Sequence, residues 1–189
     1  IQPVSPSGQG AIATIAIGAG PALALTAEQV NAVSFAELNR RKEAGPDHFI
    51  VKTQVLLSRR SILPGVIDGV DGENFRKAVA QFRRLQNLGP GEEIDELAWL
   101  ALGGETTTDV IGEYALTEKD VDYDFADAIP RDDAPQARMK RLSYTSAEEM
   151  LGERFHMSEA LLRTLNPDEG FGKAGSSLRV ASVARPTQK

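Results

Sequence analysis

The 189-residue sequence has no cysteine, two histidines and one tryptophan. The lack of cysteine excludes disulfides, thiolate nucleophiles, zinc–thiolate sites and iron–sulfur clusters. His48 and His156 have no second ligand at a useful spacing, so neither a transition-metal site nor a Ser–His triad is expected. The net charge of −6, from 21 basic and 27 acidic residues, disfavours electrostatic capture of nucleic acid. We therefore expect no metal, no cofactor and no nucleic-acid partner.

The composition is that of a folded chain. Hydrophobic residues make up 41% of the sequence and charged residues 25%, so the chain can bury a core. The length suits one ordinary domain or two small ones. The 17 glycines and 10 prolines indicate several short elements joined by turns.

Residues 1–25 carry no charge at all. The apolar run Ala11–Ile17, followed by the small residues Ala22-Leu23-Ala24, resembles the hydrophobic region and cleavage site of a signal peptide, but a basic region before it is missing. The alternative is an extended apolar segment that docks on the folded body. The run is too short, and too interrupted by Gly and Pro, for a transmembrane helix, so no transmembrane segment is expected.

Residues 26–102 have helical patterns. Thr26 with Gln29, and Ser34 with Glu37, match the capping box that begins a helix, which predicts a helical lead-in over 26–47. A further helix is expected over 49–60. Two more helices are indicated by apolar residues at helical spacing, namely Phe75, Val79, Phe82 and Leu85 in one and Leu97, Trp99 and Leu102 in the other. The sequence therefore predicts a mainly α chain.

Residues 103–140 hold ten acidic and four basic residues, which accounts for the whole negative balance of the chain. We expect an acidic connector here rather than an independent domain. The alternation Asp120, Asp122, Asp124 resembles a calcium loop, but an EF-hand starting at Asp120 needs glycine at position 125 and glutamate at 131, where this chain has Phe and Arg. These carboxylates are therefore expected to be solvated.

Residues 141–182 predict a small strand–helix–helix–strand unit, with strands at Leu142–Tyr144 and Leu178–Val180. Ser146 with Glu149 predicts the start of the first helix and Ser158 the start of the second, which Asn166-Pro167 would end. Such a small unit has little core of its own and is expected to pack against another part of the protein for stability.

Residues 48–102 resemble the small three-helix peptidoglycan-binding domain of bacterial cell-wall enzymes. That family has Q-x-x-L, then D-G-x-x-G-x-x-T-x-x-A-V-x-x-F-Q, then D-x-x-T-W-x-x-L. This chain matches it, in order and spacing, at Gln54-Val55-Leu56-Leu57, Asp68-Gly69-Val70-Asp71-Gly72, Ala78-Val79, Phe82, Asp95, Trp99 and Leu102. It departs from the family at Phe75 and Ala98, where the family has threonine, and at Arg83, where the family has glutamine.

Residues 141–182 are similar to a LysM module, a βααβ unit that binds N-acetylated glycan chains. The matching residues are Leu151, Gly152, Phe155, Met157-Ser158, Leu162, Leu165-Asn166-Pro167, Gly175 to Leu178 and Val180. The family's Gly-Asp-Thr-Leu turn is replaced by Thr145-Ser146-Ala147-Glu148, so the module is a degenerate one.

The order of a peptidoglycan-binding-like domain, an acidic connector and a LysM-like module resembles the N-terminal, non-catalytic part of exported bacterial L,D-transpeptidases. The catalytic motifs of that family, His-Gly and Ser-x-Gly-Cys-x-Arg, have no match here. The resemblance covers residues 48–182, and 183–189 would be a tail or the start of a linker. It implies an exported, periplasmic protein that carries a catalytic domain to peptidoglycan.

The resemblance also implies where a ligand would bind. In the LysM-like module the groove would lie between Thr145-Ser146 and Asn166-Pro167. In the helical domain the expected surface includes Gln54, Asp68 and Phe75. The alternative hypothesis is a structural or regulatory module that packs on the catalytic domain or on a protein partner and binds no glycan.

Other candidate sites have simpler interpretations. Trp99 could stack on a sugar ring, but its apolar helical face favours core packing. The Asp68-Gly69 and Asp71-Gly72 pairs favour tight turns over a cation site. Arg83-Arg84 is expected on an exposed helix face. Adjacent carboxylates such as Glu148-Glu149 point apart, which is unlike a glycosidase pair.

Overall fold

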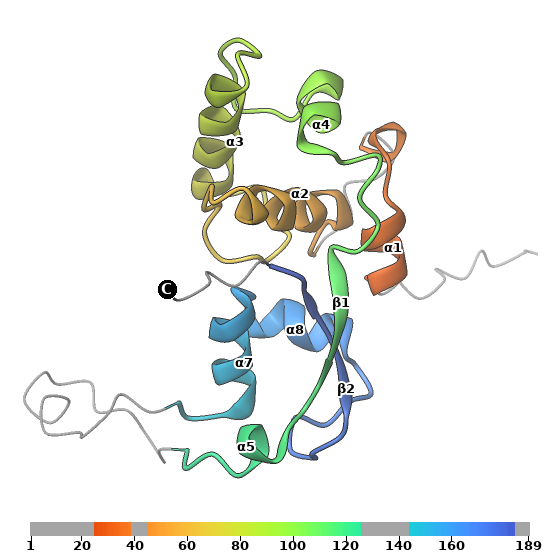
Figure 1. Cartoon of the computed structure of the whole chain (residues 1–189), viewed down its shortest axis with the longest axis vertical. Coiled ribbons are helices and arrows are strands. Elements are labelled where there is room, and N and C mark those ends of the chain that lie inside the picture. The colour runs from red at the N-terminus through yellow and green to blue at the C-terminus, as the bar shows by residue number, and fades with distance from the viewer. Residues whose placement is uncertain (1–24, 39–44, 126–143, 184–189) are drawn as a thin grey trace, which may run out of the picture.

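The computed structural model describes residues 25–38, 45–125 and 144–183, and its fold is mainly helical with one small antiparallel sheet (Figure 1). The predicted coarse fold class, mainly α with a small α+β part, is confirmed. The predictions for residues 1–24, and for the tail after Val183, concern residues outside these ranges. The described elements are, in order, α1 (Ala27–Ala32), the 3₁₀ helix η1 (Phe35–Glu37), α2 (His48–Arg59), α3 (Glu73–Leu85), α4 (Glu96–Leu102), β1 (Ile111–Ala115), α5 (Glu118–Val121), α7 (Ala147–Phe155), α8 (Glu159–Leu165) and β2 (Ser177–Ala181).

The helices begin where local capping signals predict. Thr26 and Gln29 form a reciprocal capping box at α1, and Ser34 and Glu37 form one at η1. The hydroxyls of Ser146 and Ser158 cap α7 and α8. These predictions are confirmed, because a cap depends only on residues within one turn of the helix start.

The helical unit, α1 to α4, is built around the buried helix α2 and Trp99. Trp99 is fully buried and stacks on Phe49, with 4.2 Å between ring centroids, so the core interpretation of this residue is confirmed. Gly104 lies directly against the indole: a Cβ at this position would come within 2.2 Å of ring atoms. A glycine is therefore required beside the tryptophan.

Lys52 joins α1 to α2 from inside the core. Only 1% of the residue is exposed, and its Nζ donates to the carbonyl oxygens of Asn31 (3.0 Å) and Val33 (3.1 Å) at the end of α1. Burial lowers the pKa of Lys52, while the nearby Glu105 and Glu37 oppose this effect. The lead-in is thus part of the helical core.

Arg83 was predicted on an exposed helix face, but this prediction is wrong, because only 8% of the residue is exposed. Its guanidinium forms an ion pair with Asp95 at 2.8 Å and donates to the carbonyl oxygens of Glu93 and Leu88. Arg84 is exposed, as predicted. Arg83 therefore fixes the loop between α3 and α4 onto α3.

The sheet pairs β1 with β2, with Ile111 opposite Ala181 and Tyr114 opposite Leu178. The first strand thus lies inside the stretch predicted to be a connector. The sequence predicted this strand at Leu142–Tyr144 instead. Residues 142 and 143 lie outside the described ranges, and Tyr144 belongs to no strand. The short, acidic sequence of β1 has only one fully buried residue, Ile111, so it lacks a clear period-two pattern.

The helical unit and the strand unit (β1, α5, α7, α8 and β2) lie next to each other (Figure 1) and are joined by several hydrogen bonds. The Ile67 amide donates to the carbonyl oxygen of His156 at 2.7 Å, and the Ile67 carbonyl accepts from Ser158. The side-chain amide of Asn31 both donates to and accepts from the Ile111 backbone at 2.9 and 2.8 Å. The buried side chains of both units form one continuous core.

Candidate functional site

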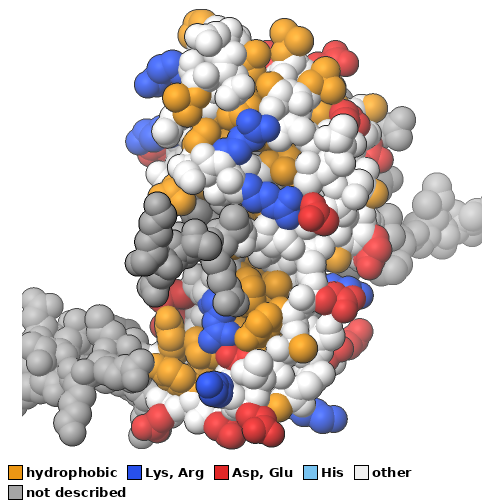
Figure 2. Space-filling view, in the orientation of Figure 1, with side chains coloured by type: hydrophobic (Ala, Val, Ile, Leu, Met, Phe, Trp, Pro, Cys, Tyr) orange, Lys and Arg blue, Asp and Glu red, His pale blue; other side chains and the backbone are white. Residues whose placement is uncertain are grey.

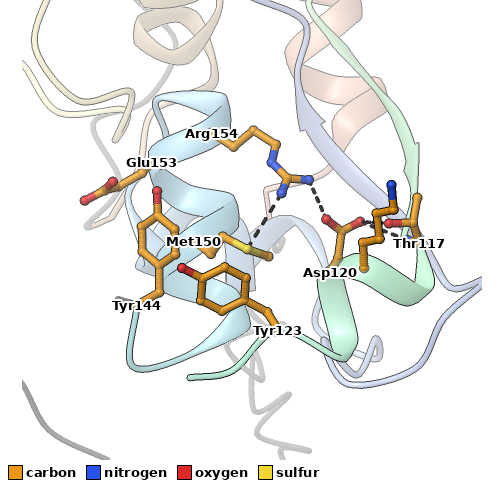
Figure 3. Close-up of a pocket in the computed structure, with 8 residues that line it drawn as sticks. Thr117, Asp120, Tyr123, Tyr144, Met150, Glu153 and Arg154 are labelled. Carbon is orange, nitrogen blue, oxygen red and sulfur yellow. Dashed lines mark hydrogen bonds and ion pairs between the residues drawn. The ribbon is translucent and has the colours of Figure 1, made fainter. Parts of the chain in front are cut away.

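A hollow of about 490 Å³ opens on the strand unit, between α5 and α7 (Figure 3). Its size is within the range of small-ligand sites. We call it the tyrosine hollow. It is lined by Thr117, Lys119, Asp120, Tyr123, Tyr144, Met150, Glu153 and Arg154.

Part of the lining of the tyrosine hollow is an ion pair between Asp120 and Arg154, whose atoms lie 2.7 Å apart. Asp120 is 3% exposed and also accepts hydrogen bonds from the Tyr114 hydroxyl at 2.7 Å and from the amide and hydroxyl of Thr117. Burial alone would raise the pKa of Asp120, but the hydrogen bonds from Thr117, Tyr114 and Arg154 outweigh it and hold the pKa well below its usual range. The prediction that Asp120 is a solvated connector residue is therefore wrong.

Two tyrosines form a wall of the hollow. The rings of Tyr123 and Tyr144 are tilted by 52° with centroids 5.7 Å apart, and Phe125 packs on Tyr123 at 5.1 Å. Burial, and next a hydrogen bond to Glu153, raise the pKa of Tyr144, so its hydroxyl stays protonated at neutral pH. Both rings are half-buried and keep part of their surface open to solvent.

One basic and one acidic side chain, Lys119 and Glu153, complete the lining of the hollow. Lys119 belongs to α5 and Glu153 to α7, and both are exposed. Figure 3 shows Glu153 beside Tyr144, whereas Asp120 and Thr117 lie across the hollow. Since Asp120 and Arg154 neutralise each other, the lining has no net charge.

The residues predicted as ligands in the helical unit are used within the fold. Gln54 is buried, its Nε2 donates to Asp68 Oδ1 at 2.8 Å, and its Oε1 accepts from the amides of Asp68 and Gly69. Phe75 is buried in the core. Gln54 and Asp68 are thus brought together as predicted, but their contacts hold the turn before α3.

The residues predicted in the LysM-like module lie at two helix ends. Thr145 is exposed and Ser146 half-buried at the start of α7, where both bond to Glu149. Asn166, at the end of α8, is 4% exposed, and Pro167 after it is exposed. The Asn166 side chain donates to the carbonyl oxygens of Leu162 and Arg179 and accepts from the Arg179 amide. Asn166 therefore ties α8 to β2.

Most of the tyrosine hollow was missed by sequence reasoning. Tyr123, Arg154, Lys119 and Glu153 belong to no recognised motif, and Tyr144 was assigned to a strand. One sequence signal could have pointed to the hollow. All three tyrosines of the chain, at positions 114, 123 and 144, lie within or just after the acidic stretch 103–140. Tyrosine pairs an apolar ring with a polar group, as binding sites often require.

Other site types find little support in the part of the chain that the structure describes. There, no three His, Asp or Glu side chains are close enough to hold a metal ion, and none of the helices is both long and apolar enough to cross a bilayer. On the face seen in Figure 2, basic and acidic side chains are interspersed, without an extended basic patch.

No family model matches the chain, and no curated protein matches it either.

Proposed function

We propose that this chain is a non-catalytic module that docks on peptidoglycan, and that it carries an attached L,D-transpeptidase catalytic domain to its substrate in the periplasm. Binding, rather than chemistry, would be its contribution. In this proposal residues 48–102 are the peptidoglycan-binding-like domain, and β1, α7, α8 and β2 are the four elements of the LysM-like module.

The observation that carries the proposal is the open tyrosine hollow on the strand unit. It combines half-buried aromatic rings with charged and hydroxyl groups, a composition suited to polar ligands that have apolar parts. The hollow adjoins the predicted groove, since Tyr144 directly precedes Thr145 and Ser146. The strand–helix–helix–strand order of β1, α7, α8 and β2 adds support at the level of fold, which by itself does not define a function.

A second candidate is a structural or regulatory module without a cell-wall ligand. It is favoured by the structural use of Gln54, Asp68 and Asn166, whose side chains hold the turn before α3 and tie α8 to β2. Two exposed leucines on α4, Leu97 and Leu100, would suit contact with another domain.

Co-sedimentation with isolated peptidoglycan sacculi tests the proposal. We expect the chain to pellet with sacculi at low and at physiological salt. Replacing Tyr123 by Ala should weaken pelleting about fivefold, because stacking on an aromatic ring contributes about 1 kcal/mol. The matched control is Leu97→Ala, an exposed change on α4 away from the hollow, which should pellet like the unmodified chain.

No pelleting at either salt concentration would contradict docking and favour the structural module. Pelleting that disappears at physiological salt would indicate nonspecific charge attraction instead. Equal loss in the Tyr123 and Leu97 variants would place binding outside the tyrosine hollow.

A further inference from the structure

We infer that the outer edge of β1 is an interaction surface, and that residues 11–17 of this chain dock on it as a third, extended strand. The surface is the side of β1 that faces away from β2. We call it the open edge and define it by the backbone of Glu113 and Ala115. The inference concerns an interaction within one molecule and does not depend on the proposed cell-wall ligand.

The first argument is the register of the sheet, which fixes the direction of each backbone group in β1. The Leu116 amide donates to the carbonyl oxygen of Ser176, just beyond the paired residues and in the same register. Bonded positions alternate along an antiparallel pair, so every second residue counted back from Leu116 bonds to β2. The residues between them direct their amides and carbonyls away from β2, and these are Ile111, Glu113 and Ala115.

Two asparagine side chains agree with these directions, and each takes the place of a further strand. The Asn31 side chain accepts from the Ile111 amide at 2.8 Å and donates to the Ile111 carbonyl at 2.9 Å. On the outer side of β2, Asn166 accepts from the Arg179 amide at 2.6 Å and donates to its carbonyl at 2.9 Å. The outer side of β2 is thus covered at Arg179, and that of β1 is covered at Ile111.

The open edge has no such cover among the residues that the structure describes. Glu113 and Ala115 are exposed, and no described group bonds to their outward amides and carbonyls. Proteins usually block such an edge with lysine, proline or a bulge, because it can template another strand. The sequence of β1 contains neither lysine nor proline, and its pairing runs without a bulge. The open edge is therefore suited to add a strand through main-chain hydrogen bonds.

The second argument is the point at which residues 1–24 join the folded body. Leu25, which follows them, is buried in the core directly before the cap of α1. α1 lies beside β1 (Figure 1), and Asn31 near its end bonds to Ile111. Because the six residues of α1 are about 9 Å long, the chain before Leu25 joins the body within one short helix length of β1.

The first turn of α1 lies near the open edge. Hydrogen bonds at the helix start lower the pKa of Glu28, in this first turn, and the charge of Arg179 adds to the effect. Arg179 lies opposite Glu113 in the sheet, so Glu28 is within electrostatic range of the edge. Residues 18–24 can span up to about 23 Å, which is enough to bring residues 11–17 alongside Glu113.

The third argument is the composition of residues 11–17. They carry no charge and contain neither glycine nor proline, and four of the seven are β-branched, namely Ile12, Thr14, Ile15 and Ile17. Such residues favour strands, and an uncharged strand places no like charge beside Glu113. A second copy of the chain fits the edge less well. Two copies would share only the stretch from Glu113 to Ala115, which is much less contact than stable dimers bury.

The test measures hydrogen exchange of single backbone amides by NMR in the full chain, at high and at low protein concentration. The amides of Glu113 and Ala115 report on the open edge, whereas those of Gly112 and Tyr114, which bond to β2, report on the sheet itself. Two variants disturb the run: Ile15→Pro, which removes a donor from a strand, and the milder Ile15→Asn. Gln9→Pro, outside the run, is the matched control.

We expect the Glu113 and Ala115 amides to exchange at least about tenfold faster in Ile15→Pro than in the unmodified chain, with a smaller increase in Ile15→Asn. The Gly112 and Tyr114 amides should stay equally protected in all forms, and Gln9→Pro should behave like the unmodified chain.

Fast exchange of the Glu113 and Ala115 amides in the unmodified chain would overturn the inference, whatever the variants do. Protection that persists in both Ile15 variants would also overturn it, because residues 11–17 would then not be the cover. Protection that is lost at low protein concentration would identify a second copy as the occupant and would equally overturn docking within one molecule.

Discussion

At the scale of single residues, three charged side chains hold this protein together from inside. Lys52 caps the end of α1, Arg83 fixes the loop before α4, and Asp120 holds α5 against α7 through Arg154. Charged residues are rarely buried unless they have ion-pair or hydrogen-bond partners, and each of these has such partners, although the buried Nε of Arg83 donates to none among the described residues. These charged side chains therefore stabilise the contacts between neighbouring elements: α1 with α2, the loop before α4 with α3, and α5 with α7.

Replacing Asp120 by Asn is expected to destabilise the fold by about 3 kcal/mol, because it leaves the half-buried Arg154 without its counter-charge. The amide also places N–H groups where the carboxylate accepted hydrogen bonds from Thr117 and Tyr114. Urea unfolding measures the change. Asp122→Asn, an exposed neighbour, is the control and should alter stability by less than about 0.5 kcal/mol.

The same carboxylate predicts a pH dependence. Its pKa is lower in the folded than in the unfolded protein, so the stability that it provides is complete above the unfolded pKa and is lost as the pH falls toward the folded one. The stability difference between the unmodified chain and Asp120→Asn should be constant from about pH 7 to 5 and should shrink below about pH 4. A difference that stays the same down to pH 2 would contradict this account of Asp120.

At the scale of elements, Asn166 connects the end of α8 to the last strand. Asn166→Ala removes three hydrogen bonds and leaves the backbone of Arg179 in β2 without its side-chain partner. We expect a loss of about 3 kcal/mol in urea unfolding, since an unsatisfied buried polar group costs about 1–3 kcal/mol. Asp168→Ala, which changes an exposed residue in the following turn, should be nearly neutral. If Asn166→Ala were equally neutral, the link between α8 and β2 would have no energetic importance.

At the scale of the whole molecule, the helical unit and the strand unit are packed together as one body. They share a continuous core and are bridged by the Ile67–His156 and Asn31–Ile111 hydrogen bonds. Arg59 adds a third link, since it donates to the carbonyl oxygen of Ser182 and pairs with Asp109. The two units are therefore held in fixed relation, without the freedom that a flexible connector gives.

This coupling predicts a single unfolding transition. Trp99 is the only tryptophan in the sequence, so its fluorescence reports on the helical unit, while hydrogen exchange of peptides from α7 to β2 reports on the strand unit. Both probes should give the same midpoint in urea. Asn31→Ala should lower both midpoints together, with Gln81→Ala, on the exposed face of α3, as the control. Two separate transitions would contradict a single folding body.

The sequence by itself determined the coarse fold class and the starts of α1, η1, α7 and α8, but not α5, which lies inside the predicted connector. Capping residues such as Thr26, Ser146 and Ser158 act within one turn, and apolar spacing marks the buried face of a helix, so both signals are local. Tertiary structure decided the pairing of the strands: Glu113 and Arg179, which pair across the sheet, are 66 positions apart. It also decided which charges are buried and where the tyrosine hollow forms. An acidic residue such as Asp120 has the same local sequence signal whether it is solvated or buried, and only the partner supplied by a distant helix makes its burial favourable.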